Sequence, residues 1–246
     1  MNRALYLFFF IIMFSISNAQ DEVYELRTYQ LAFFQPHDIL HDYFEKALIP
    51  ALNRQGVQKV GVFEEMNDQM PKKLYLLIPY SNLKAFSESK NQLANDDQYQ
   101  DASEEYFGSV GDTPFADMST NLIQSSHGFP NLTATKENAG LFELRIYESP
   151  NEDALRRKVK MFDDHEFDIF DDVGLPMLFF GYNIAGEKMP CLTYMLAFKD
   201  MDASKNAWAK FGPHPEWQRI TKLEKFQNTM NDITRVFLKP LSYSQI

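Results

Sequence analysis

The sequence predicts an α+β fold made of two tandem ferredoxin-like units, each with the element order β-α-β-β-α-β. Two observations predict it. A short motif recurs 118 positions further along the chain, and both halves then alternate apolar strands with amphipathic helices in one order. Helices cover one sheet face of such a unit and leave the other bare. We expect the two bare faces to pack together within the chain and close a barrel; the alternative is that each unit pairs with another chain.

The duplication is clearest in its first strand. Val23–Tyr29 (VYELRTY) and Leu141–Tyr147 (LFELRIY) share Glu, Leu, Arg and Tyr, each displaced by 118 positions. Further landmarks follow in the same order with displacements of 118 to 120, a spread that a small loop insertion would explain. These landmark pairs are Gly56 and Gly174, Gly61 and Gly181, Tyr75 and Tyr194, and Tyr99 and Trp217. Landmarks in one order at nearly one spacing indicate an internal duplication.

In the first copy, alternating polar and apolar residues over 22–31 are typical of a strand. Pro36 then opens a helix whose apolar residues recur at helical spacing until Gly56 closes it. The remaining predicted elements are two strands over Val57–Phe63 and Leu74–Tyr80, a helical region over Leu83–Phe107 and a short strand over Asn121–Gln124.

The second copy repeats this order after a linker rich in Gly, Pro, Asn and Thr. Its predicted elements are the strand Leu141–Tyr147, the helix Glu152–Val173, the strands Met177–Asn183 and Leu192–Phe198, two helical stretches between Ala203 and Thr229, and a last strand over Ile233–Leu238. The chain therefore divides into a first domain over 20–127, a linker over 128–139 and a second domain over 140–246.

Residues 1–19 have the pattern of a cleaved export signal. Arg3 supplies a positive charge, Ala4–Phe14 is an apolar run of 11 residues, and the small residues Ser17 and Ala19 form the cleavage site. A membrane anchor is the alternative, but a spanning helix needs about 20 apolar residues. We expect cleavage after Ala19 and a periplasmic or secreted protein that does not insert into a membrane.

The charge and the cysteine count restrict the partners. Removing the first 19 of 246 residues removes Arg3 and leaves 227 residues, with 23 basic and 34 acidic side chains and a formal charge of −11. An acidic surface repels phosphate backbones and anionic lipids, which argues against nucleic acid as a partner. Cys191 is the only cysteine, so the fold depends on core packing and not on disulfides. No phosphate loop, nucleophile elbow or Cys-x-x-Cys pair occurs, and we expect no cofactor.

At Glu25–Tyr29 (ELRTY) the chain resembles the NIPSNAP family, whose domains begin with such a strand. The resemblance covers nearly all of residues 22–240. Its further marks are Pro50 and Gly56 at the end of the first helix, Gly61 and Gly181 in a following strand, His214–Gln218 (HPEWQ) with the weaker Asp97–Gln100 (DQYQ), and the ending Leu238–Pro240 (LKP). The resemblance implies a dimeric α/β-barrel fold, and the family offers no accepted catalytic motif to carry over.

Strand periodicity selects the candidate ligand-binding residues. Residues two apart share a strand face, so the Glu, Arg and Tyr of each shared motif lie on one face and we expect that face to line the barrel. These candidates are Glu25, Arg27, Tyr29, Glu143, Arg145 and Tyr147. They would form a cationic clamp for a carboxylate or a carbonyl. The alternative, which we favour, is that Glu and Arg pair across the two sheets and lock the halves together.

His165 is the candidate catalytic residue, because it lies between Phe162 and Ile169 at the edge of the apolar stripe of its helix. Such a histidine can act as a general base in a barrel lumen, whereas the alternative is a core or rim histidine bonded to a neighbour. His37 and His41 have the one-turn spacing of metal ligands, but the second copy does not repeat them. We therefore expect a solvated helix face there and no metal site.

Two functions are left open. The first is a non-catalytic barrel that binds a small apolar or carboxylate-bearing molecule, a protein partner or a second copy of the chain. The second is a cofactor-independent monooxygenase-like or isomerase-like enzyme, with His165 and lumen Arg or Tyr groups acting on the substrate. We favour the first, because beyond Glu and Arg no pair of titratable residues occurs at matching positions in both copies.

Overall fold

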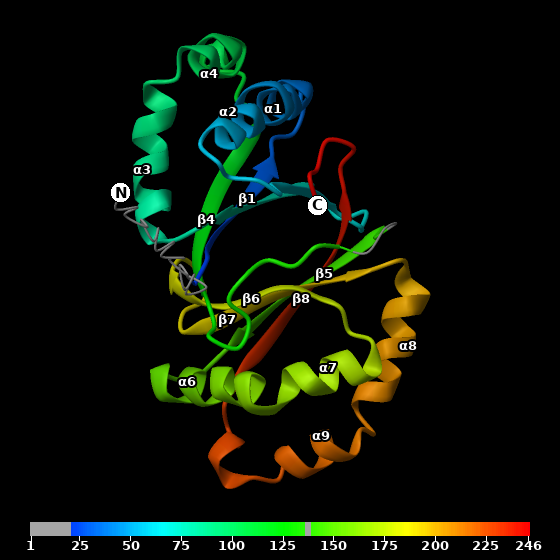
Figure 1. Cartoon of the computed structure of the whole chain (residues 1–246). Helices are drawn as coiled ribbons and strands as arrows, with labels where there is room; N and C mark the ends of the chain where they lie inside the picture. Colours follow the sequence, from blue (N-terminus) through cyan, green and yellow to red (C-terminus); the bar gives the residue numbers. More distant parts are fainter. Residues whose placement is uncertain (1–20, 136–138) are drawn as a thin grey trace, which may run out of the picture.

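The computed structural model describes residues 21–135 and 139–246. The expected export signal, residues 1–19, lies outside the described residues, as do residues 136–138 of the expected linker. Two sheets face each other across the centre of the molecule, and each carries helices on its outer side (Figure 1). Among the described residues, no helix has both the length and the apolar character needed to span a membrane.

The first unit has the predicted element order. Its first helix is continuous and ends where Gly56 takes a left-handed φ of 85°, which a residue without a Cβ atom adopts without strain. The elements are β1 (Val23–Leu31), α1 (Asp38–Asp42), the π-helical segment η1 (Tyr43–Leu48), α2 (Ile49–Arg54), β2 (Gly61–Glu65), β3 (Lys73–Tyr80), α3 (Leu83–Ala94), α4 (Asp97–Ala102), α5 (Glu104–Gly108) and β4 (Phe115–Ser125).

The second unit repeats the first. Its long helix also contains a π-helical segment and ends at a left-handed glycine, Gly174, with a φ of 81°. The elements are β5 (Leu141–Glu148), α6 (Glu152–Met161), the π-helical segment η2 (Phe162–Glu166), α7 (Phe167–Val173), β6 (Met177–Ala185), β7 (Cys191–Phe198), α8 (Met201–Phe211), α9 (Pro215–Ile220), the 3-10 turn η3 (Glu224–Phe226) and β8 (Asp232–Pro240).

Three elements of the first unit differ from the prediction, and one of them is β2, which covers Gly61–Glu65 and not Val57–Phe63. The helical region expected over Leu83–Phe107 is three helices, because the Asp96 side chain accepts a hydrogen bond from the Tyr99 amide and starts a new helix. The last strand, β4, is 11 residues long and exceeds the expected Asn121–Gln124, because it pairs with β1 along most of its length and then with β6. Polar residues at its start hide this pairing from a search for apolar runs.

The eight strands form one closed barrel in the order β1-β3-β2-β8-β5-β7-β6-β4. Each unit contributes four antiparallel neighbours with the order 4-1-3-2 of a ferredoxin-like sheet, and the units join where β2 meets β8 and where β4 meets β6. The two units therefore pair within one chain, which confirms the expected barrel.

Both faces of each sheet are buried. Helices cover the outer faces, where aromatic residues such as Phe44 in the first unit and Phe162 in the second are 0% exposed. A third apolar cluster lies between the two sheets and fills the middle of the barrel. Its largest members are Tyr24, Phe63, Tyr75, Phe142 and Phe179. The middle of the barrel is thus a packed core.

Strand pairing corrects two of the expected landmark pairs. Arg27 lies opposite Leu76 and Arg145 lies opposite Tyr194, so the counterpart of Tyr194 is Leu76, 118 positions earlier, and not Tyr75. Tyr75 packs inside the barrel whereas Tyr194 packs under the helices, because a shift of one residue moves a side chain to the other sheet face.

Comparing cross-strand partners also corrects the expected pair Gly61 and Gly181. Gly61 lies opposite Leu77 and Phe179 lies opposite Met195, so the counterpart of Gly61 is Phe179. The displacement of 118 positions therefore holds through the central strands, and no loop insertion before β7 is needed. The two matches at 119 and 120 positions are coincidences of residue type.

The last residues of the second unit return to the first unit. The Leu241 and Gln245 amides donate hydrogen bonds to the carbonyls of Val62 and Val60 at 2.9 Å each. The Tyr243 hydroxyl lies 2.6 Å from His41 Nδ1 on α1. This tail links the second unit to the helices of the first beside the β2–β8 join.

Candidate functional site

The Glu-Arg-Tyr face of β1 lies under the helices and not in the barrel. Tyr29 makes edge contacts with Phe44 and Phe115 in the outer cluster, with ring centroids 5.2 Å apart in both cases. Tyr24 and Leu26, on the opposite strand face, pack in the barrel interior. The expectation that Glu25, Arg27 and Tyr29 line the lumen is therefore wrong.

The second unit has the same orientation. Tyr147 packs against Phe162 in the outer cluster, and its hydroxyl lies 2.7 Å from the Tyr194 hydroxyl. The Arg145 guanidinium stacks on Trp208 of α8, with its Cζ 3.9 Å from the ring centroid. Glu143, Arg145 and Tyr147 therefore contact helices, and the expectation that they line the lumen is wrong as well.

Each arginine is neutralised by the glutamate of its own strand. Arg27 Nε lies 2.7 Å from Glu25 Oε1, and Arg145 Nε lies 2.8 Å from Glu143 Oε1. The alternative expectation, that these pairs bridge the two sheets, is therefore also wrong. Glu143 further accepts hydrogen bonds from Trp208 Nε1 at 2.8 Å and from Ser204 Oγ at 3.1 Å. These buried groups satisfy one another and stabilise the contact between helix and sheet.

The charges in this layer shift the pKa values of their neighbours. Burial alone would lower the pKa of the Arg145 guanidinium, but Tyr194, Tyr147 and Glu143 together raise it above its usual value. Burial raises the pKa of the Tyr194 hydroxyl well above its usual value, and the nearby Tyr147 adds to this. Both shifts favour a charged Arg145 and a neutral Tyr194.

A buried ion pair that sequence reasoning missed lies beside this network. Lys158 of α6 and Glu166 of η2 pair under the helix layer, and the Lys158 ammonium lies 4.8 Å from the Phe162 ring centroid and 5.6 Å from that of Trp217. Burial raises the pKa of the Glu166 carboxyl although Lys158 acts in the opposite direction. The signal was present in the sequence, because both charged residues fall within the apolar stripe of their helix.

His165 does not lie in the barrel lumen. Its Nδ1 is 3.2 Å from Glu216 Oε1 of α9, and its ring packs edge-on against Phe226 with centroids 5.8 Å apart. The side chain is 21% exposed on the outer side of the helix layer. The lumen position expected for a general base is therefore wrong. Of the alternative, a core or rim histidine bonded to a neighbour, the rim form describes His165.

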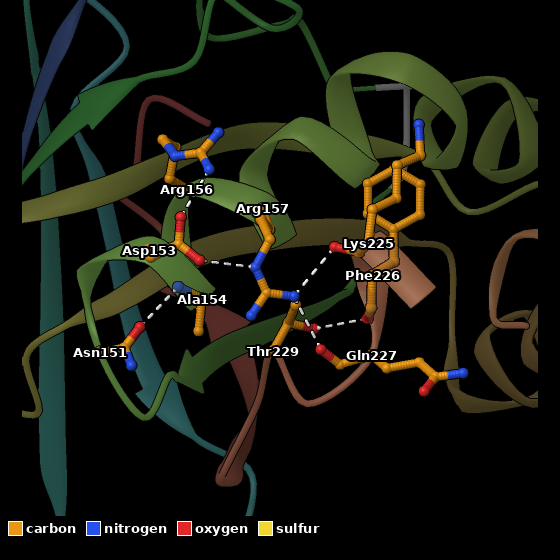
Figure 2. A network of polar contacts seen from close by, with 9 residues as sticks. All are labelled: Asn151, Asp153, Ala154, Arg156, Arg157, Lys225, Phe226, Gln227 and Thr229. Atoms are coloured by element: carbon orange, nitrogen blue, oxygen red, sulfur yellow. Dashed lines mark hydrogen bonds and ion pairs between the residues drawn. The ribbon is translucent and has the colours of Figure 1, made fainter. Parts of the chain in front are cut away.

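The segment that covers His165 is anchored by Arg157 of α6 (Figure 2). Arg157 Nε donates to Asp153 Oδ2 at 2.9 Å, and Nη1 donates to the carbonyls of Lys225 at 3.0 Å and Gln227 at 2.9 Å. These contacts hold the η3 turn against the start of α6.

His37 and His41 also have structural partners. His37 Nε2 lies 2.8 Å from the Ala32 carbonyl oxygen, and His41 bonds to Tyr243. Within residues 21–135 and 139–246, no group of three or more His, Cys, Asp or Glu side chains is placed to hold a metal ion.

The barrel has a hollow at one end, between the β2–β3 hairpin and the β6–β7 hairpin. Its volume is about 230 Å³, and both units line it. The apolar part of the lining comes from Leu26, Leu144, Ile146 and Val236. The polar part includes Glu65, Tyr75 and Asn121, whose side chains point inward from β2, β3 and β4. This hollow is the candidate functional site.

A buried carboxylate lies at the centre of the polar part. Glu65 is 7% exposed, and its Oε1 accepts a hydrogen bond from the Tyr75 hydroxyl at 2.6 Å. Its Oε2 accepts one from Asn67 Nδ2 at 3.1 Å. Burial raises the pKa of the Tyr75 hydroxyl, and the bond to Glu65 adds to this, so Tyr75 remains a hydrogen-bond donor.

The second unit has a neutral counterpart of this pair. Asn183 and Thr193 lie 118 positions after Glu65 and Tyr75, and Thr193 Oγ1 donates to Asn183 Oδ1 at 2.7 Å. Asn183 Nδ2 in turn donates to Asn121 Oδ1 at 3.2 Å. A glutamate at this position is therefore specific to the first unit. Sequence reasoning missed it because the expected strand stopped at Phe63, although Glu65 continues the inward-facing alternation.

The barrel closed within one chain defines the dimeric α/β-barrel fold. The sequence matches the NIPSNAP family over residues 24–110 and 142–245. The chain therefore belongs to the NIPSNAP family, with two domains in tandem, and the resemblance noted from the sequence is confirmed.

Solved structures share this fold. A candidate monooxygenase from Fusobacterium nucleatum is 12% identical, with 90% of this chain and 93% of that chain covered and a TM-score of 0.58. A candidate monooxygenase from Lactobacillus acidophilus is 11% identical, with 89% and 94% covered and a TM-score of 0.57. A variant of chlorite dismutase from Candidatus Nitrospira defluvii is 8% identical, with 90% and 92% covered and a TM-score of 0.50. At these identities the likeness concerns the fold alone. No curated protein matches the chain.

Proposed function

We propose that this protein is a non-catalytic barrel that binds a small molecule at its hairpin end after export from the cytoplasm. The observation that carries the proposal is the hollow of about 230 Å³ at that end. An apolar cluster fills the middle of the same barrel, so the hollow is confined to the hairpin end. Concave sites with an apolar wall and a few convergent polar groups are typical of small-molecule binding.

The hollow is one shared site and not one site per unit. The inward side chains of β1 and β5 meet there from opposite sheets, and Glu65 supplies a charge that its counterpart Asn183 lacks. We therefore expect one ligand per chain. The expected carboxylate-binding clamp has no support, because Arg27 and Arg145 lie on the other side of their sheets.

The proposal is tested by native mass spectrometry of residues 20–246 purified from the exported compartment. We expect an adduct that survives on the folded protein and is lost on denaturation. Ser119→Trp fills the hollow from β4 and is expected to abolish the adduct. Met118→Trp is the matched control, because the neighbouring side chain points to the opposite strand face and is 45% exposed. An adduct that survives Ser119→Trp on folded protein would contradict the proposed site.

The alternative of a cofactor-independent monooxygenase or isomerase has less support. Its named base, His165, lies outside the barrel and pairs with Glu216. The structural neighbours named as candidate monooxygenases are at most 12% identical to this chain, so they supply the fold and not a reaction. A protein partner or a second copy is the remaining alternative, and a clean apo mass combined with a specific pull-down through the hairpin end would favour it.

A further inference from the structure

The ionisable side chain buried beside the hollow is a glutamate, Glu65, whereas the sequence led us to expect an arginine there. Glu65 has 7% of its surface exposed and faces the hollow at the hairpin end. The two side chains that donate hydrogen bonds to it, Tyr75 and Asn67, are neutral. A carboxylate offers about four acceptor positions, so Glu65 has room for further donors from the side of the hollow.

No cation of the described residues lies within 4.0 Å of the Glu65 carboxylate. Two lysines line the hollow. Lys188 is already occupied, because its ammonium lies 2.9 Å from Glu148 and 2.8 Å from Thr234 Oγ1. Lys73 and Glu65 each lie one residue beyond the Glu64–Leu74 pair on the side of the β2–β3 hairpin, and both line the hollow, yet the two do not form an ion pair.

Acidic groups outnumber basic ones in the lining. Asp117 at the start of β4 and Glu187 in the β6–β7 hairpin line the hollow together with Glu65. Low-dielectric walls focus the field of such a cavity, so the potential inside attracts cations and repels anions. A buried carboxylate without a counter-charge is also costly, and a bound cation relieves that cost.

The other wall of the hollow is apolar. Leu26 and Leu144 face it from equivalent positions of β1 and β5, and Ile146 and Val236 extend this surface. A volume of about 230 Å³ limits the ligand to a compact molecule. A ligand that matches both walls therefore carries one charged donor group and a small apolar body.

We propose that the hollow binds a small organic cation, a primary or secondary amine with a compact apolar body, whose ammonium group donates hydrogen bonds to Glu65. This inference rests on the proposed function, since it assigns the ligand class of the same site. A charge-assisted bond from an ammonium to a carboxylate is about twice as strong as a neutral one, which makes Glu65 the main determinant of specificity.

The test uses three probes of one shape: cyclohexylamine, which is protonated at neutral pH, cyclohexanol and cyclohexanecarboxylate. Each is titrated into 15N-labelled protein, residues 20–246, and followed by amide chemical shifts. We expect cyclohexylamine to shift amides of β2, β3 and β4 around the hollow and to bind at least tenfold more tightly than either of the other probes. Glu65→Gln is expected to weaken cyclohexylamine binding at least tenfold.

Two further variants control the experiment. Glu64→Gln removes the same charge from the neighbouring residue, which points to the opposite strand face and pairs with Lys239 at 3.2 Å, and it is expected to leave binding unchanged. Lys73→Met removes a like charge from the lining and is expected to tighten cyclohexylamine binding at least about threefold, because the Coulomb repulsion between Lys73 and the bound ammonium is lost.

The outcomes separate this inference from the proposed function. The inference of a cationic ligand would be overturned if the neutral or the anionic probe bound more tightly in the hollow. It would also be overturned if the parent and Glu65→Gln bound cyclohexylamine with equal affinity. Either result would leave the proposed small-molecule site in place. If none of the three probes shifts amides around the hollow and no native adduct exists, both proposals are overturned.

Discussion

Lys158 and Glu166 form an ion pair in which only 2% of each side chain is exposed. The two residues lie eight positions apart, on α6 and on the π-helical segment that follows it. In the first unit the equivalent positions, 118 residues earlier, hold Leu40 and Leu48, both 0% exposed. The same place in one duplicated fold is thus filled by a charged pair in one unit and by two leucines in the other.

This relationship predicts the stability of Lys158 variants. Lys158→Leu alone leaves the Glu166 carboxylate buried without its partner, and we expect it to lower the free energy of unfolding by about 3–5 kcal/mol. The double variant Lys158→Leu/Glu166→Leu copies the first unit, and replacing a buried pair by packed apolar side chains is often neutral or stabilising by about 1–4 kcal/mol. Urea unfolding followed by far-UV circular dichroism measures both.

The matched control is Leu40→Met in the first unit, which changes shape at the equivalent position without adding charge and should cost less than about 1.5 kcal/mol. A double variant that is destabilised as strongly as Lys158→Leu would show that the second unit requires the ion pair itself.

Much of the fold was predictable because the duplication and the hydrophobic periods agree. The motif around Glu25 recurs at Glu143, the helix-ending glycines recur at Gly56 and Gly174, and every predicted strand is present. The need to cover two bare sheet faces favoured closure of the barrel within one chain but left pairing with another chain open.

The orientation of the first strand was not predictable from polarity. In this fold helices bury the outer face of each sheet and the opposite sheet buries the inner face, so both faces of β1 carry apolar residues. Tyr24 faces inward and Tyr29 outward, yet both are at most 2% exposed. Alternation identifies the two sets of residues and contains no information on which set meets the helices.

The pKa of His41 predicts a pH dependence. Burial lowers the pKa of this imidazole, although Asp38 and Glu64 act in the opposite direction. The unfolded chain then binds the proton first as pH falls below the usual histidine pKa of about 6.5. The contribution of His41 to stability is therefore full above that pH and is lost as pH falls toward the lower folded-state pKa.

We expect His41→Gln, which cannot titrate, to flatten the dependence of the free energy of unfolding on pH below about 6.5. Chemical denaturation at a series of pH values measures the free energy of unfolding of the parent and of the variant. In the difference between the two values, the contributions of the titratable groups that both proteins contain cancel. The protection factors of the Leu241 and Gln245 amides should also fall at low pH in the parent, because burial disfavours the charged His41 beside this tail. Parallel stability curves would contradict this assignment.

The Arg157 network predicts a local loosening (Figure 2). Arg157→Ala removes the donors to the Lys225 and Gln227 carbonyls, and we expect a loss of about 1 kcal/mol and faster hydrogen exchange over residues 224–229. Arg156→Ala is the control, because Arg156 is 67% exposed and pairs only with Asp153 within the same helix. Equal exchange rates in the two variants would show that η3 is held by packing alone.

The β4–β6 join predicts a strict requirement for glycine. Gly181 pairs with Ser125, and a Cβ atom at position 181 would lie 2.3 Å from the Gln124 carbonyl oxygen on the neighbouring strand. Because the obstructing atom belongs to the backbone, the strands must move apart, and we expect Gly181→Ala to cost about 1–3 kcal/mol. The change in the urea unfolding midpoint measures this cost.

Two other glycines show whether the effect belongs to barrel closure. At Gly61, beside the β2–β8 join, the three atoms nearest to an added Cβ atom belong to the side chains of Phe63 and Ile246 and none to the backbone, so Gly61→Ala should cost less than Gly181→Ala. At Gly212, just after α8, an added Cβ atom would have no described heavy atom within 4 Å apart from its chain neighbours and the helix backbone, and φ is −55°, so Gly212→Ala should leave stability unchanged or raise it by about 0.5 kcal/mol. If all three variants unfold at the same urea concentration, the close contact at Gly181 does not govern the closure of the barrel.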